Sequence, residues 1–252
     1  PPLSPELSSA PALDPLAEPT ARVGRRFIAV LALTNLGIWT AFFTPIQFLL
    51  PLQVEAIDPA AKESNLGIVV AVGALVALVA SPLAGAFSDR TSARLGRRRT
   101  WVLWPTLAAC GVLALMGGLT TIGGLVLGWA MAQLTLNASY AAVTAMLPDQ
   151  VPVAQRGTVG AVVGAAQPLG IILGSLIATL VPGDNTAPDG QQLRYLVVLV
   201  VVLLTAVLFV AAMKDPRLDP ERIPAFHLGS FTRAFWVSPR EHPDFAWVFV
   251  TR

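Results

Sequence analysis

Long apolar blocks without lysine or arginine make up most of the chain. They cover residues 27–54, 65–88, 101–147, 157–193 and 195–213. A run of about 18 or more apolar residues is typical of a transmembrane helix, because about 20 residues at 1.5 Å each cross the hydrocarbon layer. The two longest blocks exceed one crossing, and each contains helix-breaking residues: glycine pairs at 117–118 and 123–124 in the first, and VPGDNTAPDG at 181–190 in the second.

The blocks predict an all-α, polytopic membrane protein. We expect six spans, at residues 27–52, 66–88, 101–118, 124–147, 158–181 and 195–213. A seventh span begins at residue 245 and is cut off at Arg252, so we expect a fragment that ends inside a helix. The predicted domains are a disordered, proline-rich tail at 1–21, a six-helix transmembrane bundle at 22–213, a cytoplasmic central loop with an amphipathic segment at 214–244, and the start of the seventh helix at 245–252.

Composition agrees with a membrane protein. The mean hydropathy is +0.66, and 54% of the residues are hydrophobic while only 13% are charged. The one cysteine, Cys110, excludes an internal disulfide or a multi-cysteine metal site. His227 and His242 lie in a polar loop, where we expect them to be solvated. We therefore expect neither a metal nor a cofactor.

Basic residues concentrate on alternate connections between the spans. Three arginines precede the first span, five lie between the second and third, one lies between the fourth and fifth, and five basic residues follow the sixth. The other side holds Lys62 and Arg194. Because lysine and arginine are retained on the cytoplasmic face, the N-terminus and the 214–244 loop are predicted to be cytoplasmic, in an inner or plasma membrane.

Two spans carry polar side chains along one helical face, at spacings of three and four residues. Such groups are costly in lipid, so they face either a protein interior or a watery cavity. We expect a central cavity that binds solute through Asn35, Thr40, Thr44, Gln47, Gln133, Asn137, Tyr140, Thr144 and Gln167. The alternative, that these groups only join one helix to another, stays open, most of all for Asn137, because a single amide often does this.

The order of span types predicts an internal repeat. Polar, small-residue and fully apolar spans follow one another twice, and the small-residue face of the second span includes Gly67, Ala71 and Gly85. A unit with an odd number of spans gives two copies of opposite orientation, which is typical of secondary transporters. The sequence LPLQV at 50–54 closes the first span, and LPDQV at 147–151 closes the fourth.

The connection between the second and third spans, GAFSDRTSARLGRRR at residues 85–99, is unusually charged. Arginines beside a span can serve topology alone, but topology does not require Asp89 at the end of a helix. The pattern G-x-x-x-D-R-x-x-x-R-x-G-R-R-R resembles the loop 2–3 signature of the major facilitator superfamily. The form SDR followed by GRRR resembles the plant sucrose transporter and glycoside–pentoside–hexuronide branches of that superfamily.

The resemblance covers about residues 22–252 and includes LPDQVPVAQRGT and REHPDFAWVF. It implies the N-terminal half of a twelve-helix transporter, with the missing C-terminal half of the same chain and the lipid bilayer as partners. It also implies a conformational lock at the cytoplasmic seam between the halves, where the carboxylate of Asp89 would lie near the N-terminus of a helix. The lock residues are Gly85, Asp89, Arg90, Arg94, Gly96, Arg97 and Arg98.

The function that we expect is secondary-active or facilitative transport of a small solute by alternating access, with a sugar or glycoside as the expected substrate. As the resemblance implies, proton-coupled sucrose carriers keep an acid and a base within the fourth span, where this chain has Gln133 and Thr144. Coupling needs a titrating group, so that group lies in the missing half or the protein couples differently.

Four other functions compete with sugar transport. Drug or metabolite efflux and a non-transporting scaffold or sensor are alternatives. An enzyme is disfavoured, because no nucleophile–base pair is visible. Nucleic-acid binding is disfavoured as well, because stacking aromatics are lacking near the arginines.

Overall fold

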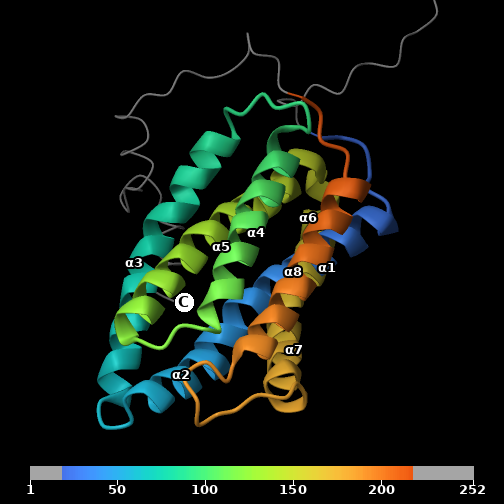
Figure 1. The fold of residues 1–252 in the computed structure, drawn as a ribbon. Coiled ribbons are helices and arrows are strands. Elements are labelled where there is room, and N and C mark those ends of the chain that lie inside the picture. The colour runs from blue at the N-terminus through green and yellow to red at the C-terminus, as the bar shows by residue number, and fades with distance from the viewer. Residues whose placement is uncertain (1–18, 218–252) are drawn as a thin grey trace, which may run out of the picture. The chain divides into compact units, whose positions relative to one another are not determined.

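The computed structural model describes residues 19–217, which are helical wherever they form regular structure (Figure 1). The tail up to residue 18, most of the 214–244 loop and the seventh span lie outside the described residues. The elements are α1 (Arg25–Thr44), a π-helical turn (Pro45–Leu49), α2 (Leu50–Ile57), α3 (Lys62–Ser88), α4 (Arg97–Met116), α5 (Ile122–Gln150), α6 (Val153–Gly164), α7 (Ala166–Leu180) and α8 (Gln192–Ala212).

Five helical stretches are long and apolar enough to cross a membrane, and they identify a multi-pass membrane protein. They are Arg25–Ile57, Lys62–Ser88, Arg97–Met116, Val153–Leu180 and Gln192–Ala212. Each contains all or most of a predicted span. The prediction for the first span ended too early, because α1, the π-helical turn and α2 form one helical stretch of 33 residues.

The π-helical turn has its origin in Pro45. Proline has no backbone N–H, so it cannot donate to the carbonyl one turn earlier. The hydrogen-bond register shifts here, and the N–H of Leu50 donates to the carbonyl of Pro45, five residues back. The break between α6 and α7 has a similar cause, because Pro168 has no N–H to donate to the carbonyl of Gly164.

The predicted fourth span corresponds to α5, which is not among the five stretches. It has 29 residues, or about 43 Å at 1.5 Å per residue, so it is longer than a hydrocarbon layer of about 30 Å. Leu125, Trp129, Leu136, Val143 and Met146 are fully buried. Their spacing in threes, fours and sevens is that of a helix packed along one face.

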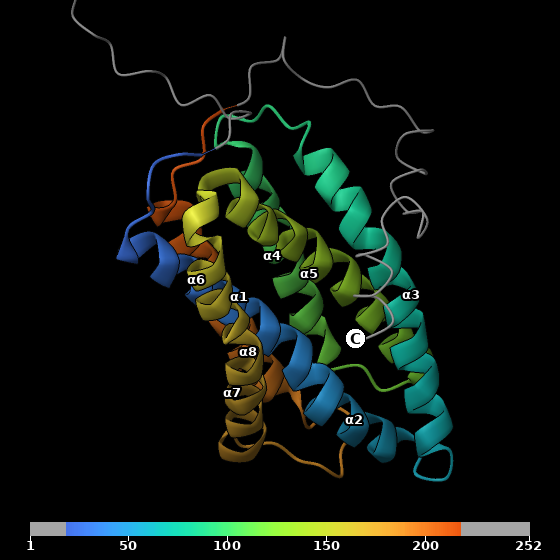
Figure 2. The ribbon, with the colours of Figure 1, turned by 180° about the vertical axis from the view of Figure 1, so that it is seen from behind.

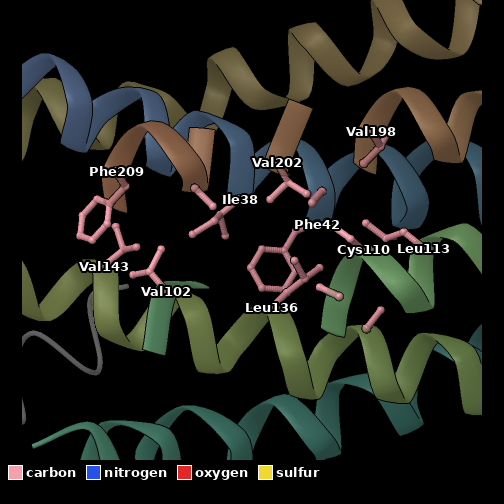
Figure 3. Close-up of a cluster of buried hydrophobic side chains, with 14 of the residues drawn as sticks. Ile38, Phe42, Val102, Cys110, Leu113, Leu136, Val143, Val198, Val202 and Phe209 are labelled. Carbon is pink, nitrogen blue, oxygen red and sulfur yellow. The ribbon is translucent and has the colours of Figure 1, made fainter. Parts of the chain in front are cut away.

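Two helices are central to the packing (Figures 1 and 2). The main partners of α5 are α3 and α4, and the main partners of α1 are α7 and α8. Contact between α4 and α8 joins the two groups. Figure 3 shows Ile38 and Phe42 of α1 and Phe209 of α8 facing Leu136 and Val143 of α5 across the core.

Glycines permit the closest helix contacts. A Cβ at Gly73 of α3 would lie 2.5 Å from the Trp129 ring, and one at Gly170 of α7 would lie 2.8 Å from the Cβ of Trp39. On the small-residue face predicted for the second span, Gly67 and Gly85 do not provide such a contact: no atom of another described helix lies within 4 Å of a Cβ placed there. Helical periodicity shows which residues share one face of a helix. It does not show whether a neighbouring helix packs against that face.

Candidate functional site

One end of the bundle gathers the arginines; we call it the basic end. It comprises residues 22–26, 88–99, 148–156 and 213–217. Hydrogen bonds connect these segments, such as the one from the backbone N–H of Val23 to Oε1 of Gln155, at 2.8 Å. The side-chain amide of Gln150 also donates to the carbonyl of Lys214, at 2.7 Å.

Arg98 is the centre of a buried ionic cluster at the basic end. Its side chain is 5% exposed, and its Nε lies 2.7 Å from Oδ2 of Asp149 while its Nη2 lies 2.6 Å from Oδ1 of Asp89. Its Nη1 donates to the hydroxyl of Ser88, at 2.9 Å. Arg97 adds a second ion pair to Asp149, at 2.8 Å. The start of α4 is thereby joined to the ends of α3 and α5 by charge-assisted hydrogen bonds.

Asp215 caps the N-terminus of α4 from the segment that follows α8. Its Oδ2 accepts the backbone N–H groups of Arg98, at 2.6 Å, and Arg99, at 2.9 Å. These donors have no partner inside the helix, and a carboxylate is favoured by the helix dipole. Gly96 makes the approach possible, since its φ is +97° and a Cβ there would lie 2.5 Å from the carbonyl oxygen of Asp215.

Burial is the main influence on the protonation of Asp215. Removal from water raises the pKa of its carboxyl above the ordinary 3.8, although the backbone N–H groups of Arg99 and Arg98 act in the opposite direction. The charged form is therefore less favourable here than in water.

The predicted lock residues fall into two groups. Asp89, Gly96, Arg97 and Arg98 belong to the ionic cluster or to the cap on α4. Arg90 donates to the carbonyl of Ala86, at 2.6 Å, Arg94 is exposed, and Gly85 is half-buried. Sequence reasoning missed Ser88, Asp149 and Asp215. Asp149 was available as the acid of LPDQV, and Asp215 as the first acid after the sixth span.

The predicted solute-site residues do not form one polar row. Tyr140 lies in an aromatic cluster that joins α1 and α5, with its ring centroid 5.1 Å from that of Trp39 and 6.3 Å from that of Phe42. Trp39 also stacks on Phe43, at 5.3 Å. Trp39, Phe43 and Tyr140 are each half-buried.

The two amides of α5 bond to each other and to α3. The Nδ2 of Asn137 donates to Oε1 of Gln133, at 2.8 Å, and its Oδ1 accepts the hydroxyl of Ser81, at 3.1 Å. Gln133 is buried and Asn137 is half-buried. The bond to Ser81 joins α5 to α3, whereas the bond between Asn137 and Gln133 lies within α5.

The other predicted solute-site residues are either enclosed or exposed. Asn35 and Thr40 are buried and donate to carbonyls of their own helix, Leu31 and Leu36. Thr44 is buried against Gly174, and its hydroxyl has no hydrogen-bond partner among the described residues. Three side chains are exposed: Gln47, Thr144 and Gln167.

A family model described as Major Facilitator Superfamily matches residues 27–251. The chain belongs to the major facilitator superfamily. The matched residues include the whole 85–99 loop, whose pattern predicted this family, and all of the ionic cluster around Arg98.

Among solved structures, the superfamily fold is also seen in the human organic anion transporter MFSD10 (TETRAN). The two chains share 19% sequence identity with a TM-score of 0.65, over 82% of this chain and 52% of that one. This chain therefore spans about half the length of the MFSD10 chain. No curated protein sequence matches this chain closely enough to count as a relative.

Replacing Asp215 by asparagine tests the effect of its burial. Asp215→Asn keeps an acceptor oxygen for the N–H groups of Arg98 and Arg99 but carries no charge. Because the folded-state pKa is raised, the wild type loses stability as pH rises from about 4 and Asp215 ionises. We expect Asp215→Asn to melt at or above the wild-type temperature at neutral pH, with the difference shrinking on acidification.

The control is Asp215→Leu, which removes the acceptor and should melt lower at every pH. Thermal unfolding of the full-length protein in detergent is the measurement. A neutral-pH melting temperature of Asp215→Asn clearly below that of the wild type would contradict the raised pKa.

Proposed function

We propose that this chain is the N-terminal half of a transporter that moves a small organic solute across the membrane by alternating access. Membership of the superfamily and five membrane-capable helical stretches support transport. Coverage of about half of the MFSD10 chain supports the half-transporter interpretation. On this proposal α5 is the remaining span, whose polar groups face other helices or the solute path.

The six spans are proposed to be two inverted repeats of three. The first is α1 with α2, α3 and α4, and the second is α5, α6 with α7, and α8. In this scheme α1 corresponds to α5, α3 to α7, and α4 to α8. The main helix contacts agree with the scheme, because α5 packs on α3 and α4 while α1 packs on α7 and α8. The contact between α4 and α8 joins the third helix of each repeat, so exchanging the two repeats leaves it unchanged.

The aromatic contact between Trp39 and Tyr140 carries the proposal for the solute site. It joins the first helix of each repeat, and both rings are half-buried, so each keeps a surface for a ligand. Aromatic rings can cover the apolar face of a sugar, and the exposed Gln47, Thr144 and Gln167 offer hydrogen bonds to hydroxyls. The six predicted spans contain no Asp, Glu, Lys or Arg. A neutral polar solute, a sugar or glycoside, is therefore the first candidate.

Efflux of an amphipathic drug or metabolite is the second candidate, and one observation favours it. The amides of Gln133 and Asn137 already bond to each other and to Ser81. What remains at this face is mainly aromatic surface, which suits a flat apolar solute. MFSD10 is described as an organic anion transporter. An anionic solute here would need a cation from outside the six spans.

Transport by the purified full-length protein in liposomes separates these candidates. Saturable uptake of radiolabelled sugars or glycosides, with no movement of amphipathic dyes, supports the first candidate. The reverse supports the second. Absence of transport for both panels, with a correctly folded protein, would favour the scaffold or sensor interpretation.

Tyr140→Leu tests the site in the same assay. Loss of the aromatic face removes about 1 kcal/mol of binding, so we expect KM to rise about fivefold while the melting temperature changes little. Leu127→Ala is the matched control, because Leu127 lies on the same helix and is 68% exposed. A large fall in melting temperature with an unchanged KM would mean that Tyr140 serves packing.

The basic end is proposed to be cytoplasmic, with Asp89 as the part of the lock that faces the other half. Its carboxylate is 51% exposed while its partner Arg98 is 5% exposed, so Asp89 can reach a second partner. The excess of arginine and lysine at this end supports the orientation.

Cysteine labelling tests the orientation. A membrane-impermeant maleimide added outside intact cells should label Glu63→Cys and leave Ala21→Cys unlabelled, since these exposed residues lie at opposite ends of the bundle. Protein without an introduced cysteine measures the background from Cys110, which is buried. Labelling of position 21 but not of position 63 would reverse the topology.

A further inference from the structure

A second polar cluster lies at the end opposite the basic end, around Arg194. The Arg194 residue is 6% exposed. Its Nη1 donates to Oε1 of Gln191, at 2.6 Å, and to Oδ1 of Asn185, at 2.7 Å. Its Nε donates to the carbonyl of Val181, at 3.0 Å. A Cβ at Gly183 would lie 2.8 Å from the guanidinium carbon, so the connection between α7 and α8 wraps this side chain closely.

Gln53, near the end of α2, connects four segments at the same end. It is fully buried. Its side-chain amide donates to the carbonyls of Met116, at 3.0 Å, and Pro188, at 3.3 Å, and its carbonyl accepts the hydroxyl of Tyr195, at 2.8 Å. We call Gln53, Asn185, Gln191, Arg194 and Tyr195 the distal cluster.

Residues of the distal cluster correspond to residues of the basic end that lie a fixed number of positions away in the sequence. LPLQV and LPDQV lie 97 residues apart, so Gln53 corresponds to Gln150. The same displacement takes Arg97 to Arg194. It also relates two further identical pairs: Met116 with Met213, and Gly73 with Gly170.

Burial and hydrogen bonding follow the displacement. Arg97 and Arg194 are each 6% exposed. Gln53 donates to the carbonyl of Met116 at the end of α4, and Gln150 donates to the carbonyl of Lys214, one residue past Met213, the counterpart of Met116. The two clusters are thus counterparts at opposite ends of the bundle.

The counterparts differ in charge. The basic end has three acids around its arginines, Asp89, Asp149 and Asp215. The positions displaced by 97 residues hold Thr186, Leu52 and Gly118. Arg194 instead donates to a backbone carbonyl and to two neutral side-chain amides. Asp89 of the ionic cluster has a half-exposed side chain that can change partners, whereas Gln53, Gln191, Arg194 and Tyr195 of the distal cluster are buried and Asn185 is its exposed member.

We propose that the distal cluster is a fixed clamp. It holds the ends of α2, α4 and α8 and the 181–191 connection together throughout the conformational cycle, and its ionic counterpart is the end that changes partners. Opening the distal cluster would strand a buried guanidinium and a buried amide without hydrogen bonds, which is strongly unfavourable. The conformational cycle is taken from the proposed function, whereas the clamp itself rests on the contacts.

Hydrogen exchange of the full-length protein tests the clamp. We expect backbone amides in 181–191 to exchange at the same rate with and without saturating solute, and at least about tenfold faster in Arg194→Ala. Melting temperature should fall in Arg194→Ala and Gln53→Leu. The matched control is Lys62→Ala at the same end, whose ion pair with Glu55 is exposed and should be almost dispensable.

Three results would overturn the clamp. One is solute-dependent exchange in 181–191, which would show that this end moves. Another is unchanged exchange and melting temperature in Arg194→Ala. The third is a raised KM in that variant with stability intact, which would place Arg194 in the solute path. Should Arg194→Ala not accumulate, Asn185→Leu removes one acceptor, leaves the guanidinium in place and gives the same readouts.

The experiments can refute the clamp without refuting the proposed transport activity, and the reverse. Exchange and melting temperature are measured without a transport assay. If no solute is transported, the comparison of Arg194→Ala with Lys62→Ala still decides whether the distal cluster holds the helix ends.

Discussion

Arg98 and the carboxylates around it determine how the helix ends meet at one end of this apolar bundle. The side chain is 5% exposed and bonds to Asp89 and Asp149 at 2.6 and 2.7 Å. A guanidinium in such a place must be matched by charge and by hydrogen bonds, because an unpaired buried charge is far more costly than an unpaired surface one. This requirement fixes α4 relative to α3 and α5. The cap from Asp215 extends the same arrangement to the end of α8.

The helices could be predicted because lipid imposes a simple rule. Backbone groups in hydrocarbon must bond internally, so an apolar run of sufficient length is a helix. The predicted second span, 66–88, therefore agrees closely with Lys62–Ser88. Irregularities inside the helices were not predicted. Pro45 shifts the register without ending the helix, and Pro168 interrupts it, although both prolines lack the same backbone N–H.

The candidate site could be predicted in part, and its long-range contacts could not. Local spacing singled out Asp89 and the arginines, but two further partners of Arg98 lie 51 residues away at Asp149 and 117 residues away at Asp215. A helical period also placed Gln133 and Thr144 on one stripe of α5. In the fold Gln133 is buried and Thr144 is exposed. A stripe follows the helix, whereas burial depends on where the neighbouring helix crosses it.

Arg97 and Arg194 occupy corresponding positions at the two ends of the bundle, but the groups that accept their hydrogen bonds differ in charge. At one end the guanidinium groups face carboxylates, and at the other Arg194 faces neutral oxygens. The half-exposed Asp89 can exchange its partner for water or for another charge, while Gln191 and Arg194 are buried against each other. A bundle built this way has one end suited to changing partners and one suited to holding its shape.

The most direct test of the central role of the ionic cluster is a double-mutant cycle at Arg98 and Asp149, in which the free energy of unfolding is measured for each variant. Arg98→Met or Asp149→Leu alone leaves a buried charge short of a partner, and each should cost about 3–5 kcal/mol in the free energy of unfolding. The double variant should lose clearly less than the two single losses combined, with a coupling on the order of 2 kcal/mol. Additive losses would show that the two residues stabilise the fold independently, and would contradict the ion pair as the interaction that organises the helix ends.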